Sequence, residues 1–554
     1  MKSKIQQFVD ETIEDYLRAG GLNGGDDFSY DLAASKEGGR GDFACNVAFK
    51  LSKMIRRSPR EVAQTLVEQM EERCRRDPGT GIARIEIAGA GFINFTLARK
   101  SYGEILKEVF ARGEHYGVSD FGKGRKVLLE FVSANPTGPL TIAHGRQAAV
   151  GDALANILGA SGHAVEREYY LNDAGRQMKL LGQSLWVRYR NLLGEEVPLP
   201  EDAYQGEYLI AIAQKLKTEK QDALMKCPAD EAVRFCSQFA GEDIMAGIRE
   251  DLALLGVRMD HYFSEGTLFS GGQVEATLAL LSQKGFLYEK EGALWFRSTD
   301  FGDDKDRVVR KSTGETTYLA PDIAYHRYKF DRGFQWLINF LGPDHHGYVT
   351  RLKAACRALG HRAEDIDVRI VQLTTLYRKG EPVRMSTRAG QFVTLRELVE
   401  EVGADAARFF FIMRKVESHL DFDLELAKQK SQDNPVYYLQ YAYARIASLI
   451  RFAQRPVRQD AELDRLVAEE ETALIRMISE FPHALVSASE LMEPYRLADY
   501  LRDLATCFHK FYSLHRIVTE DQPLTDARLL LAEAVKITME NGLRLLGISR
   551  PETM

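Results

Sequence analysis

Residues 128–158, LLEFVSANPTGPLTIAHGRQAAVGDALANIL, constrain the fold of this chain more than any other stretch. The apolar run at residues 128–132 predicts a strand, and an apolar repeat at spacings of three and four predicts a helix from near His144 that ends at Gly159. The residues that break the chain between them are Asn135, Pro136, Gly138 and Pro139. Strand, loop and helix in this order open a doubly wound nucleotide fold, in which the loop and the helix N-terminus favour a phosphate.

The middle of the chain continues this alternation of strand and helix. Further strands are predicted at residues 164–171, 336–341 and 368–373, and a hairpin at 293–297 and 307–311. Residues 183–287 are mainly helical in pattern. We therefore expect a Rossmann-like domain at residues 116–400, with a parallel sheet and a helical insertion at about residues 175–300.

Two further domains are expected on either side, which makes the chain a multidomain α/β protein. Residues 1–115 predict an α+β domain, with helices at 2–18 and after the capping box of Ser58 and Glu61, and strands near 82–87 and 92–97. Residues 401–554 predict an all-α helical bundle. Its expected helices cover residues 405–414, 435–452, 463–477, 497–514 and 525–545.

Composition excludes some classes of protein and leaves others open. The six cysteines are scattered without a CxxC pair, so neither a disulfide framework nor a structural zinc site is indicated. No apolar run approaches the roughly 18 residues of a membrane span, and no targeting signal is evident, so we expect a cytoplasmic protein. The net charge of −7 leaves nucleic-acid binding open, because basic groups can be confined to one groove.

Several motifs resemble those of class I aminoacyl-tRNA synthetases, and of arginyl-tRNA synthetases in particular. SANPTGPLTIAHGR resembles the class I signature, and RMSTR stands where the class has KMSKS. GDFACNVAFKLSK and GAGFINF resemble the extra N-terminal domain of the arginyl family, and NPVYYLQYAYARI resembles its anticodon-binding domain. The resemblance spans nearly the whole chain. It implies that the N-terminal domain touches the outer corner of a tRNA and that the inserted segment lies over the acceptor end.

The resemblance places an ATP site at the signature and at two later loops. Where the family has His, an aliphatic residue, Gly and His, this chain has Thr141, Ile142, Ala143 and His144. Thr141 and His144 lie three apart, so both side chains can project toward one anion. The residues implied to bind ATP are Thr141, Ala143, His144, Gly145, Gly342, Asp344, His345, Met385 and Ser386. Those implied in catalysis are Thr141, His144, Arg384, Ser386 and Arg388.

Departures from the family pattern concern the phosphates. Arg384 replaces the first lysine of KMSKS and Thr387 the second. Some members without the second lysine have a lysine just upstream of the signature tetrad, where this chain has Gly138. Stabilisation of pyrophosphate then falls on Arg384, Arg388 or an arginine elsewhere. The alternative interpretation of this loop is a solvated basic segment.

Vicinal histidines in GPDHHGY raise the alternative of a metal site. Neighbours in sequence diverge in direction, and no third ligand follows at a useful spacing. Asp344, His345 and His346 are therefore interpreted as contacts to the nucleotide, as the resemblance implies.

A set of acids and acceptors suits an arginine side chain. A guanidinium is planar, permanently charged and rich in donors, so a selective pocket offers carboxylates and fixed acceptors. Glu130, Asn135, Tyr318 and Asp322 provide these groups, and the resemblance assigns the same residues, with Asn94 of GFINF, to the substrate. The alternative is that the acids are ordinary surface carboxylates and that Asn94 closes a turn.

Candidate tRNA contacts lie in the bundle and beside the second strand. Tyr441, Gln440 and Arg445 fall in the motif that resembles the anticodon-binding domain, where an unstacked base can lie on an aromatic face. Aromatic residues at helical spacing are also typical of a core. Asn172, Asp173 and Arg176 are candidates for the acceptor end, with a charged turn capping a helix as the alternative.

The function that the resemblance implies is arginine–tRNA ligase. Such a protein activates L-arginine with ATP and Mg²⁺ and passes arginyl to tRNA(Arg), releasing AMP and pyrophosphate, and in the family the first step requires bound tRNA. We expect a monomer without a structural metal and without a membrane partner. Thr141, Ala143 and Thr387 keep an alternative open, a synthetase-like tRNA-binding protein with reduced or lost adenylation. A same-fold enzyme for another amino acid is disfavoured by Glu130 with Asp322.

Overall fold

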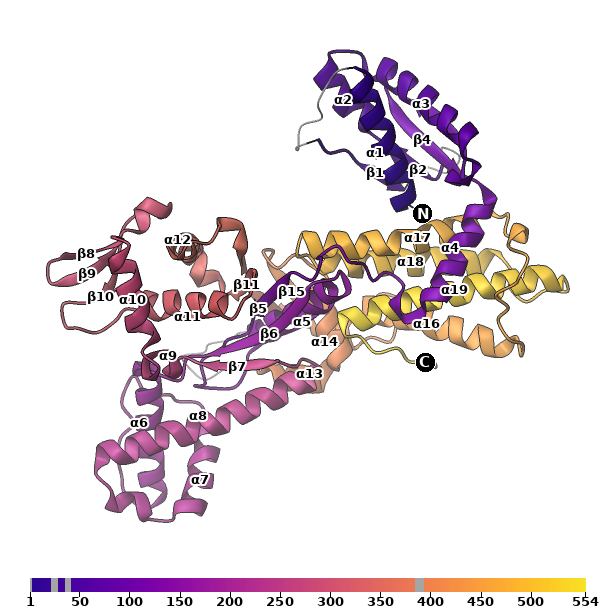
Figure 1. Ribbon diagram of the computed structural model, residues 1–554. Coiled ribbons are helices and arrows are strands. Elements are labelled where there is room, and N and C mark those ends of the chain that lie inside the picture. Colours follow the sequence, from indigo (N-terminus) through magenta and orange to yellow (C-terminus); the bar gives the residue numbers. More distant parts are fainter. Residues whose placement is uncertain (1, 21–27, 35–40, 384–392) are drawn as a thin grey trace.

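The computed structural model describes residues 2–20, 28–34, 41–383 and 393–554 (Figure 1). A five-stranded parallel sheet, ordered β12-β11-β5-β6-β7, forms its centre. The strands are β5 (Lys126–Glu130), β6 (Ala164–Leu171), β7 (His261–Ser264), β11 (Trp336–Leu341) and β12 (Ile366–Ile370). Because the strand order reverses between β5 and β11, the crevice at their carboxyl ends is the expected ligand site. The predicted Rossmann-like parallel sheet is confirmed.

Two details of the sheet differ from the prediction. β5 ends at Glu130, two residues earlier than expected, because Val132 and Ser133 adopt φ angles of 70° and 39° that leave the extended region. β7 lies inside the stretch predicted to be helical. Its four residues, HYFS, are too short for a recognisable alternation, and pairing with β6 determines their structure.

The helix after β5 is enclosed by other elements. α5 (Ile142–Ala160) begins two residues before the predicted position, and most of its side chains are buried. Small residues allow this close packing. A Cβ added to Gly151 would lie 2.4 Å from Cγ of Phe131, so only glycine fits at this contact with the chain after β5. This packing holds the N-terminus of α5 at the carboxyl ends of the strands.

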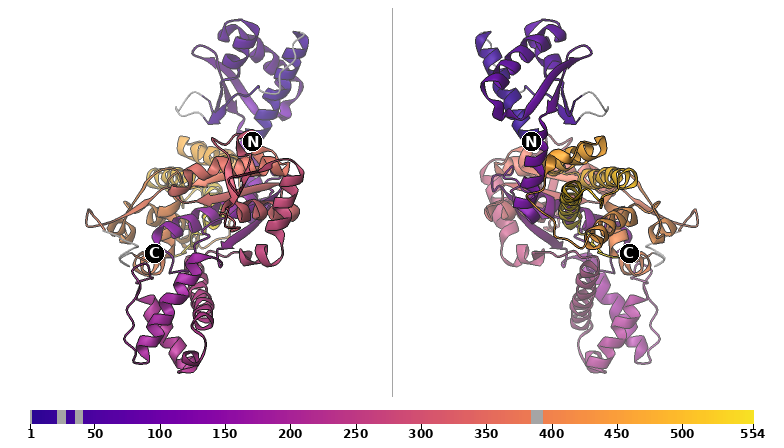
Figure 2. Two further views of the ribbon diagram at one scale, coloured as in Figure 1. Left: turned by 90° about the vertical axis from the view of Figure 1, so that its left-hand side faces the viewer. Right: turned by 90° about the vertical axis from the view of Figure 1, so that its right-hand side faces the viewer.

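Helices between β6 and β7 form an arm that projects from the sheet, at the end of the molecule opposite the N-terminal domain (Figures 1 and 2). They are α6 (Arg176–Leu192), α7 (Tyr208–Lys220) and α8 (Ala229–Leu254). Between β7 and β11 follow α9 (Gly266–Ser270), α10 (Gln273–Gln283), β8 (Leu287–Lys290), β9 (Ala293–Phe296), β10 (Arg307–Arg310) and α11 (Leu319–Asp331). The predicted hairpin is confirmed as β9 and β10, and β8 adds an antiparallel third strand that was not predicted.

The loop after β11 leads into a short helical turn, η5 (Pro343–Tyr348), and then α12 (Val349–Leu359). A smaller sheet follows β12. It consists of β13 (Thr374–Arg378), β14 (Glu381–Pro382) and β15 (Leu420–Asp423), with α13 (Leu395–Val402), α14 (Ala404–Ile412) and α15 (Leu424–Lys428) beside it. β15 lies in the region predicted to be all-α, between the helices expected at residues 405–414 and 435–452, and its parallel pairing with β13 accounts for it. The remaining short turns are η1 (Pro78–Thr80), η2 (Gly113–His115), η3 (Ala223–Lys226), η4 (Ser298–Phe301), η6 (Ala363–Asp365) and η7 (Leu463–Arg465).

The N-terminal part has the predicted α+β character. An antiparallel sheet, ordered β1-β2-β4-β3, packs against α1 (Lys2–Ala19), α2 (Val47–Ile55) and α3 (Pro59–Arg76). Its strands are β1 (Leu32–Ala34), β2 (Phe43–Cys45), β3 (Ile82–Ala88) and β4 (Phe92–Leu97). The capping box of Ser58 and Glu61 is present, with N–O distances of 3.3 Å and 3.2 Å. α4 (Arg99–Arg112) then runs along the C-terminal helices (Figure 1).

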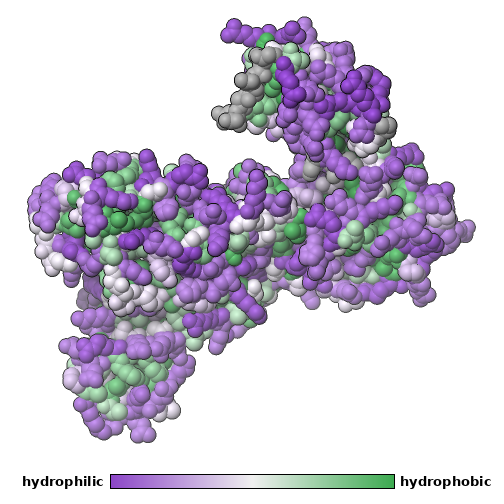
Figure 3. Space-filling model, in the orientation of Figure 1, coloured by the Kyte–Doolittle hydropathy of each residue, from purple (hydrophilic) through white to green (hydrophobic). Residues whose placement is uncertain are grey.

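Four long helices form the C-terminal bundle, as predicted: α16 (Pro435–Phe452), α17 (Glu469–Glu490), α18 (Tyr495–Leu514) and α19 (Gln522–Leu546). α17 continues well past the predicted end at residue 477 and contains Pro482 in its interior. Hydrophilic residues cover most of the face seen in Figure 3. Among the helices that the structure describes, none has the length and apolar character required to cross a membrane.

Candidate active site

A strained turn after β5 shapes one wall of the site. Val132 is β-branched and buried, yet its φ of 70° lies in the left-handed region, and Ser133 follows with φ of 39°. Three hydrogen bonds stabilise this turn. The Ser133 hydroxyl accepts the Tyr170 N–H at 3.1 Å and donates to Oε1 of Glu130 at 3.2 Å, and the Tyr169 hydroxyl donates to the Ala134 carbonyl at 2.8 Å. The turn thereby fixes Glu130 at the edge of the sheet.

A cavity of about 580 Å³ opens at the carboxyl ends of β5 and β11. It brings together residues predicted from separate parts of the sequence: Glu130, Asn135, His144, Tyr318, Asp322, Gly342, Asp344 and His345. Glu130 and Asp322 face the same space although 192 positions separate them in the chain, counted as 322 minus 130. The two acids therefore form one site, as the requirement of a guanidinium predicts.

Asp322 is the more strongly perturbed of these acids. Burial, first, and then the negative charges of Glu265 and Glu130 raise the pKa of its carboxyl to about 7, although the Tyr348 hydroxyl donates to it and Lys329 lies nearby. A cation placed beside Asp322 would remove most of this penalty. Tyr348, the last residue of GPDHHGY, was not predicted to belong to the site. No sequence signal marks its hydrogen bond.

Glu130 is already paired. Its Oε2 accepts a short hydrogen bond from Nζ of Lys329, a side chain with no exposed surface on α11. Glu130 was predicted to bind arginine, and Lys329 was not predicted to belong to the site. Lys329 stands seven residues after Asp322, two helical turns along the same face, so the helical spacing carried a signal for it.

The signature histidine forms the start of α5. The ring Nδ1 of His144 accepts the backbone N–H of Thr141 at 3.1 Å, and the Thr141 hydroxyl lies 3.2 Å from the same nitrogen. Burial lowers the pKa of His144 to about 4, so the ring is neutral at physiological pH. Because Nδ1 accepts, the proton is on Nε2, which is left as a donor. Thr141 was predicted to face the anion beside His144, but its hydroxyl contacts the histidine.

Two other signature positions differ in exposure. Ala143 is exposed and does not line the cavity. Gly145 is buried, and an added Cβ would lie 2.6 Å from Cδ1 of Leu395, so glycine serves the packing of α5 against α13. The structure thus gives Gly145 a packing contact, where an ATP contact was predicted. His144 and Thr141 also line a smaller adjoining cavity of about 270 Å³ with Gly138.

Comparison with known proteins agrees with this geometry. The chain matches the arginyl tRNA synthetase N terminal domain at residues 2–97, the catalytic domain of class I (R) tRNA synthetases at 106–417 and the DALR anticodon binding domain at 439–554. It is 47% identical to the arginine–tRNA ligase of Syntrophotalea carbinolica over 560 residues and 48% identical to that of Geobacter sp. strain M21 over 559 residues, covering 100% of each chain. The chain belongs to the arginyl-tRNA synthetase family.

Solved structures of this family share the fold. Thermus thermophilus arginyl-tRNA synthetase superimposes with a TM-score of 0.79 at 22% identity, over 100% of both chains. The Plasmodium falciparum arginyl-tRNA synthetase gives a TM-score of 0.75 at 18% identity, over 100% of this chain and 99% of that one. At these identities the likeness concerns the arrangement of the elements.

The second phosphate loop of the family falls on residues that the structure leaves out. Arg384, Met385, Ser386 and Arg388, with Thr387, lie outside the described residues. Among the described residues that line the two cavities beside His144, there is no lysine or arginine. In the described part of the chain, the wall of the cavity near His144 therefore offers a helix N-terminus, a neutral imidazole and the Asp344 carboxylate, without a basic side chain.

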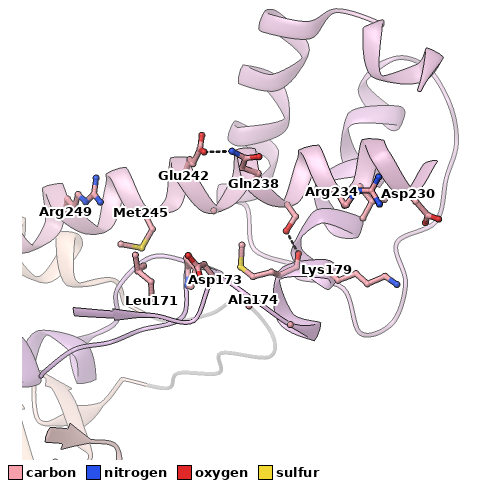
Figure 4. A pocket seen from close by; sticks show the side chains of 16 residues that line it. Leu171, Asp173, Ala174, Lys179, Asp230, Arg234, Gln238, Glu242, Met245 and Arg249 are labelled. Atoms are coloured by element: carbon pink, nitrogen blue, oxygen red, sulfur yellow. Dashed lines mark hydrogen bonds between the residues drawn. The ribbon is translucent and has the colours of Figure 1, made fainter. Parts of the chain in front are cut away.

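The arm contributes a third cavity, of about 860 Å³, between α8 and the loop after β6 (Figure 4). In Figure 4, Met245 points from α8 toward Leu171 and Asp173 on the other side of the cavity, and Arg234 and Lys179 lie at its other end. The loop separates this cavity from the active site. Asn172 and Gln177 line the active site, and Gln177 accepts a hydrogen bond from the Asn135 side chain at 2.7 Å. Of the candidates for the acceptor end, Arg176 is exposed beside this loop.

Predicted site residues of the N-terminal domain and of the helical bundle do not line the active-site cavity. Asn94 is buried in β4 of the N-terminal sheet, where it pairs with Glu86 and Ala44, and the structure does not bring it to the cavity. In the bundle, Tyr441 and Arg445 line a cavity of about 330 Å³, with the Arg445 guanidinium 4.4 Å from the Tyr441 ring centre. Gln440 is bonded to Asp405 at 2.8 Å and does not line it.

The vicinal histidines make separate contacts. His345 lies 3.1 Å from Asp344, and His346 lies 3.4 Å from the Gln372 amide. Within the described ranges, no group of three or more histidine, cysteine, aspartate or glutamate side chains is arranged to hold a metal ion.

Proposed function

We propose that the cavity carries out both steps of arginine–tRNA ligation, the reaction catalysed by this family. The full-length similarity to curated arginine–tRNA ligases supports a working ligase over a protein that only binds tRNA. In the first step the arginine carboxylate attacks the α-phosphate of ATP, and pyrophosphate leaves. In the second, the terminal ribose of tRNA takes arginyl from the adenylate, and AMP leaves. The protein contributes orientation and charge stabilisation.

The single observation that carries this proposal is the meeting of Glu130 and Asp322 in one cavity beside His144. Two carboxylates with Tyr318 and Asn135 offer several of the acceptors that a guanidinium needs. Asp322 gains most from the contact, because a cation offsets the burial that raises the pKa of its carboxyl. The substrate side chain lies toward α11, and its carboxylate toward His144.

ATP is placed at the start of α5, with Gly342, Asp344 and His345 on the opposite wall. Nε2 of His144 donates to a phosphate oxygen, and the N-terminus of α5 adds its dipole. Mg²⁺ enters with the nucleotide and is held through phosphate oxygens, since Mg²⁺ is commonly bound by phosphates and water. Arg384 and Arg388, outside the described residues, are assigned to the leaving pyrophosphate.

The tRNA is proposed to contact three parts of the chain. The acceptor end passes the cavity between α8 and the loop after β6, because the terminal ribose must reach a carboxylate on the other side of that loop. An unstacked anticodon base lies against Tyr441 and Arg445. The N-terminal α+β domain contacts the outer corner.

Pyrophosphate exchange tests the proposal directly. We expect exchange that depends on arginine, with ATP, Mg²⁺ and tRNA(Arg) present, and little exchange without tRNA. Each other amino acid serves as a control at the same concentration. Absence of exchange under both conditions would favour the tRNA-binding alternative, and exchange driven by another amino acid would contradict the arginine pocket.

A further inference from the structure

Helix α11 meets the central sheet through buried polar side chains. Asn339 on β11, Glu130 on β5 and Glu168 on β6 are direct cross-strand neighbours, so their side chains stand in one row on one face of the sheet. All three are buried. From α11, Lys329 reaches Glu130, and Arg332 reaches Glu168. Helices usually cover a sheet with an apolar stripe, so this row of paired charges calls for an explanation.

Lys329 lies behind the active cavity. Its Nζ contacts Oε2 of Glu130 and lies 3.4 Å from Oδ1 of Asn339 and 4.0 Å from the ring centre of Tyr325. Glu130, Asn339 and Tyr325 all line the cavity, whereas Lys329 has no exposed surface. A substrate can therefore touch the carboxylate of Glu130 but not the ammonium group behind it.

This arrangement decides the charge of the empty pocket. A buried carboxylate without a cation takes up a proton, because its charged form loses hydration. Asp322 shows the tendency in the same cavity, with a pKa raised to about 7. Glu130 differs from Asp322 in having a buried ammonium on one oxygen and the Ser133 hydroxyl on the other.

We propose that Lys329 is a positioning residue that sets the charge of the arginine pocket: it holds Glu130 ionised and aimed into the cavity before the substrate arrives. The guanidinium then meets one carboxylate, Glu130, that is already charged. Binding releases a proton only from Asp322. The inference rests on the proposed function of this cavity. It concerns specificity, because the pocket matches a side chain of one positive charge.

Other titratable groups face this pair from every neighbouring element. Burial keeps most of them neutral: it lowers the pKa of His326 to about 3, raises that of Cys356 on α12 to about 12, and raises those of Tyr325 and Tyr170. Glu168 is paired with Arg332. Asp322 and Glu265 remain, both with a raised carboxyl pKa. Glu265→Gln is therefore the matched control, because it removes a nearby carboxyl and leaves the pair of Lys329 and Glu130 intact.

The pH dependence of the arginine KM tests the inference, measured by pyrophosphate exchange with the full chain and tRNA. Without Lys329 the buried pair has lost its cation, and a carboxyl of the pocket must release a proton for arginine to bind. In Lys329→Met, the KM should therefore fall as pH rises from 7 to 8.5, by at most about tenfold per pH unit, the limit for one linked proton. Because Lys329 also lowers the pKa of Asp322, the double variant with Glu130→Gln decides which carboxyl is responsible. The kcat at saturating arginine should change little. In the wild type and in Glu265→Gln, the KM should be nearly level over this range.

A merely structural role for Lys329 predicts a different result. It would raise the arginine KM of Lys329→Met equally at both pH values, or lower kcat, and either outcome would overturn the inference. The double variant Glu130→Gln with Lys329→Met replaces the buried ion pair by a neutral pair, which proteins often tolerate. It should remain folded, with a raised KM that does not depend on pH above 7.5.

A measurement on the wild type requires no variant. Calorimetry of arginine binding in two buffers of different ionisation enthalpy counts the protons released. At pH 8 we expect close to zero, and release of a full proton would contradict the assignment to Lys329. Asp322→Asn separates this outcome from failure of the proposed function. An unchanged arginine KM in that variant would show that arginine does not bind in this cavity.

Discussion

The two ends of the active cavity handle charge in opposite ways. At the arginine end, Glu130 and Asp322 are buried acids whose partners, Lys329 and Tyr348, are already in place. At the nucleotide end, the described residues offer His144, whose ring is neutral, and the N-terminus of α5. The arginine end is preorganised for a small cation. At the proposed nucleotide end, no described residue that lines the two cavities is a lysine or arginine, so we assign the stabilisation of phosphate charge to Mg²⁺ and to Arg384 and Arg388.

The largest expected effect is at the arginine end. Asp322→Asn should lower kcat/KM for arginine by about 100-fold or more, the cost of removing one partner from a buried charge pair, while the ATP KM stays within about threefold. Steady-state pyrophosphate exchange measures both constants. Asp344→Asn, in the same cavity but exposed, is the control and should affect ATP more than arginine. Equal effects of Asp322→Asn on the two substrates would contradict the division of the cavity.

At the nucleotide end, His144→Ala should lower kcat by about 100-fold, the usual effect of removing a donor aimed at developing charge, with little change in arginine binding. Substitution of His144 by Gln or by Asn tests its two ring nitrogens separately. His144→Gln keeps a donor near the position of Nε2 and should retain more activity than His144→Asn, which keeps only an acceptor for Thr141. Because the pKa of His144 is about 4, no titration of this group should appear between pH 5.5 and 8. The opposite order of the Gln and Asn variants would place catalysis on Nδ1.

A smaller gain is expected from adding charge to the nucleotide end. Gly138 has no left-handed φ, and an added Cβ would meet only the end of the Tyr208 ring, at ordinary contact distances that begin at 3.5 Å from the hydroxyl oxygen, so a side chain is tolerated there. Gly138→Lys should lower the ATP KM by about threefold, as one partly exposed cation near phosphate would. Gly138→Gln controls for bulk, and an equal effect of both variants would exclude a role for the charge.

The smallest effect concerns stability. Burial raises the pKa of Asp322 to about 7 from its ordinary value of 3.8, so the folded chain holds a proton that the unfolded chain has already released. The wild type therefore loses stability as pH rises from about 4 to 7 and then levels off. Asp322→Asn should raise the Tm at pH 8 by about 2 °C and leave it unchanged near pH 4, measured by thermal denaturation. A lower Tm at pH 8 would show that Asp322 is stabilised by a partner in the empty site.

The elements that carry the site were largely predictable, because the strand-loop-helix pattern around Glu130 and His144 is local. Residue roles at the arginine end followed from the family motifs, and the cavity brings Glu130, Asn135, Tyr318 and Asp322 together. Partner choice was not predictable. Lys329 and Tyr348 are paired only because α11 and α12 pack where they do, and the burial of Gly145 depends on α13. Asn94 shows what a motif does not give. Its sequence predicts the strand β4 but not the position of that strand relative to the cavity.

The valine that follows β5 has a consequence for engineering. Val132 holds a backbone geometry that glycine would adopt freely, but its side chain is buried, so glycine would relieve the strain and leave a cavity in its place. A glycine at this position would also loosen the turn that holds Glu130 in place. At Val132 thermal stability and ligase activity can therefore be affected separately. A selection for aminoacylated tRNA is the one expected to retain the branched side chain.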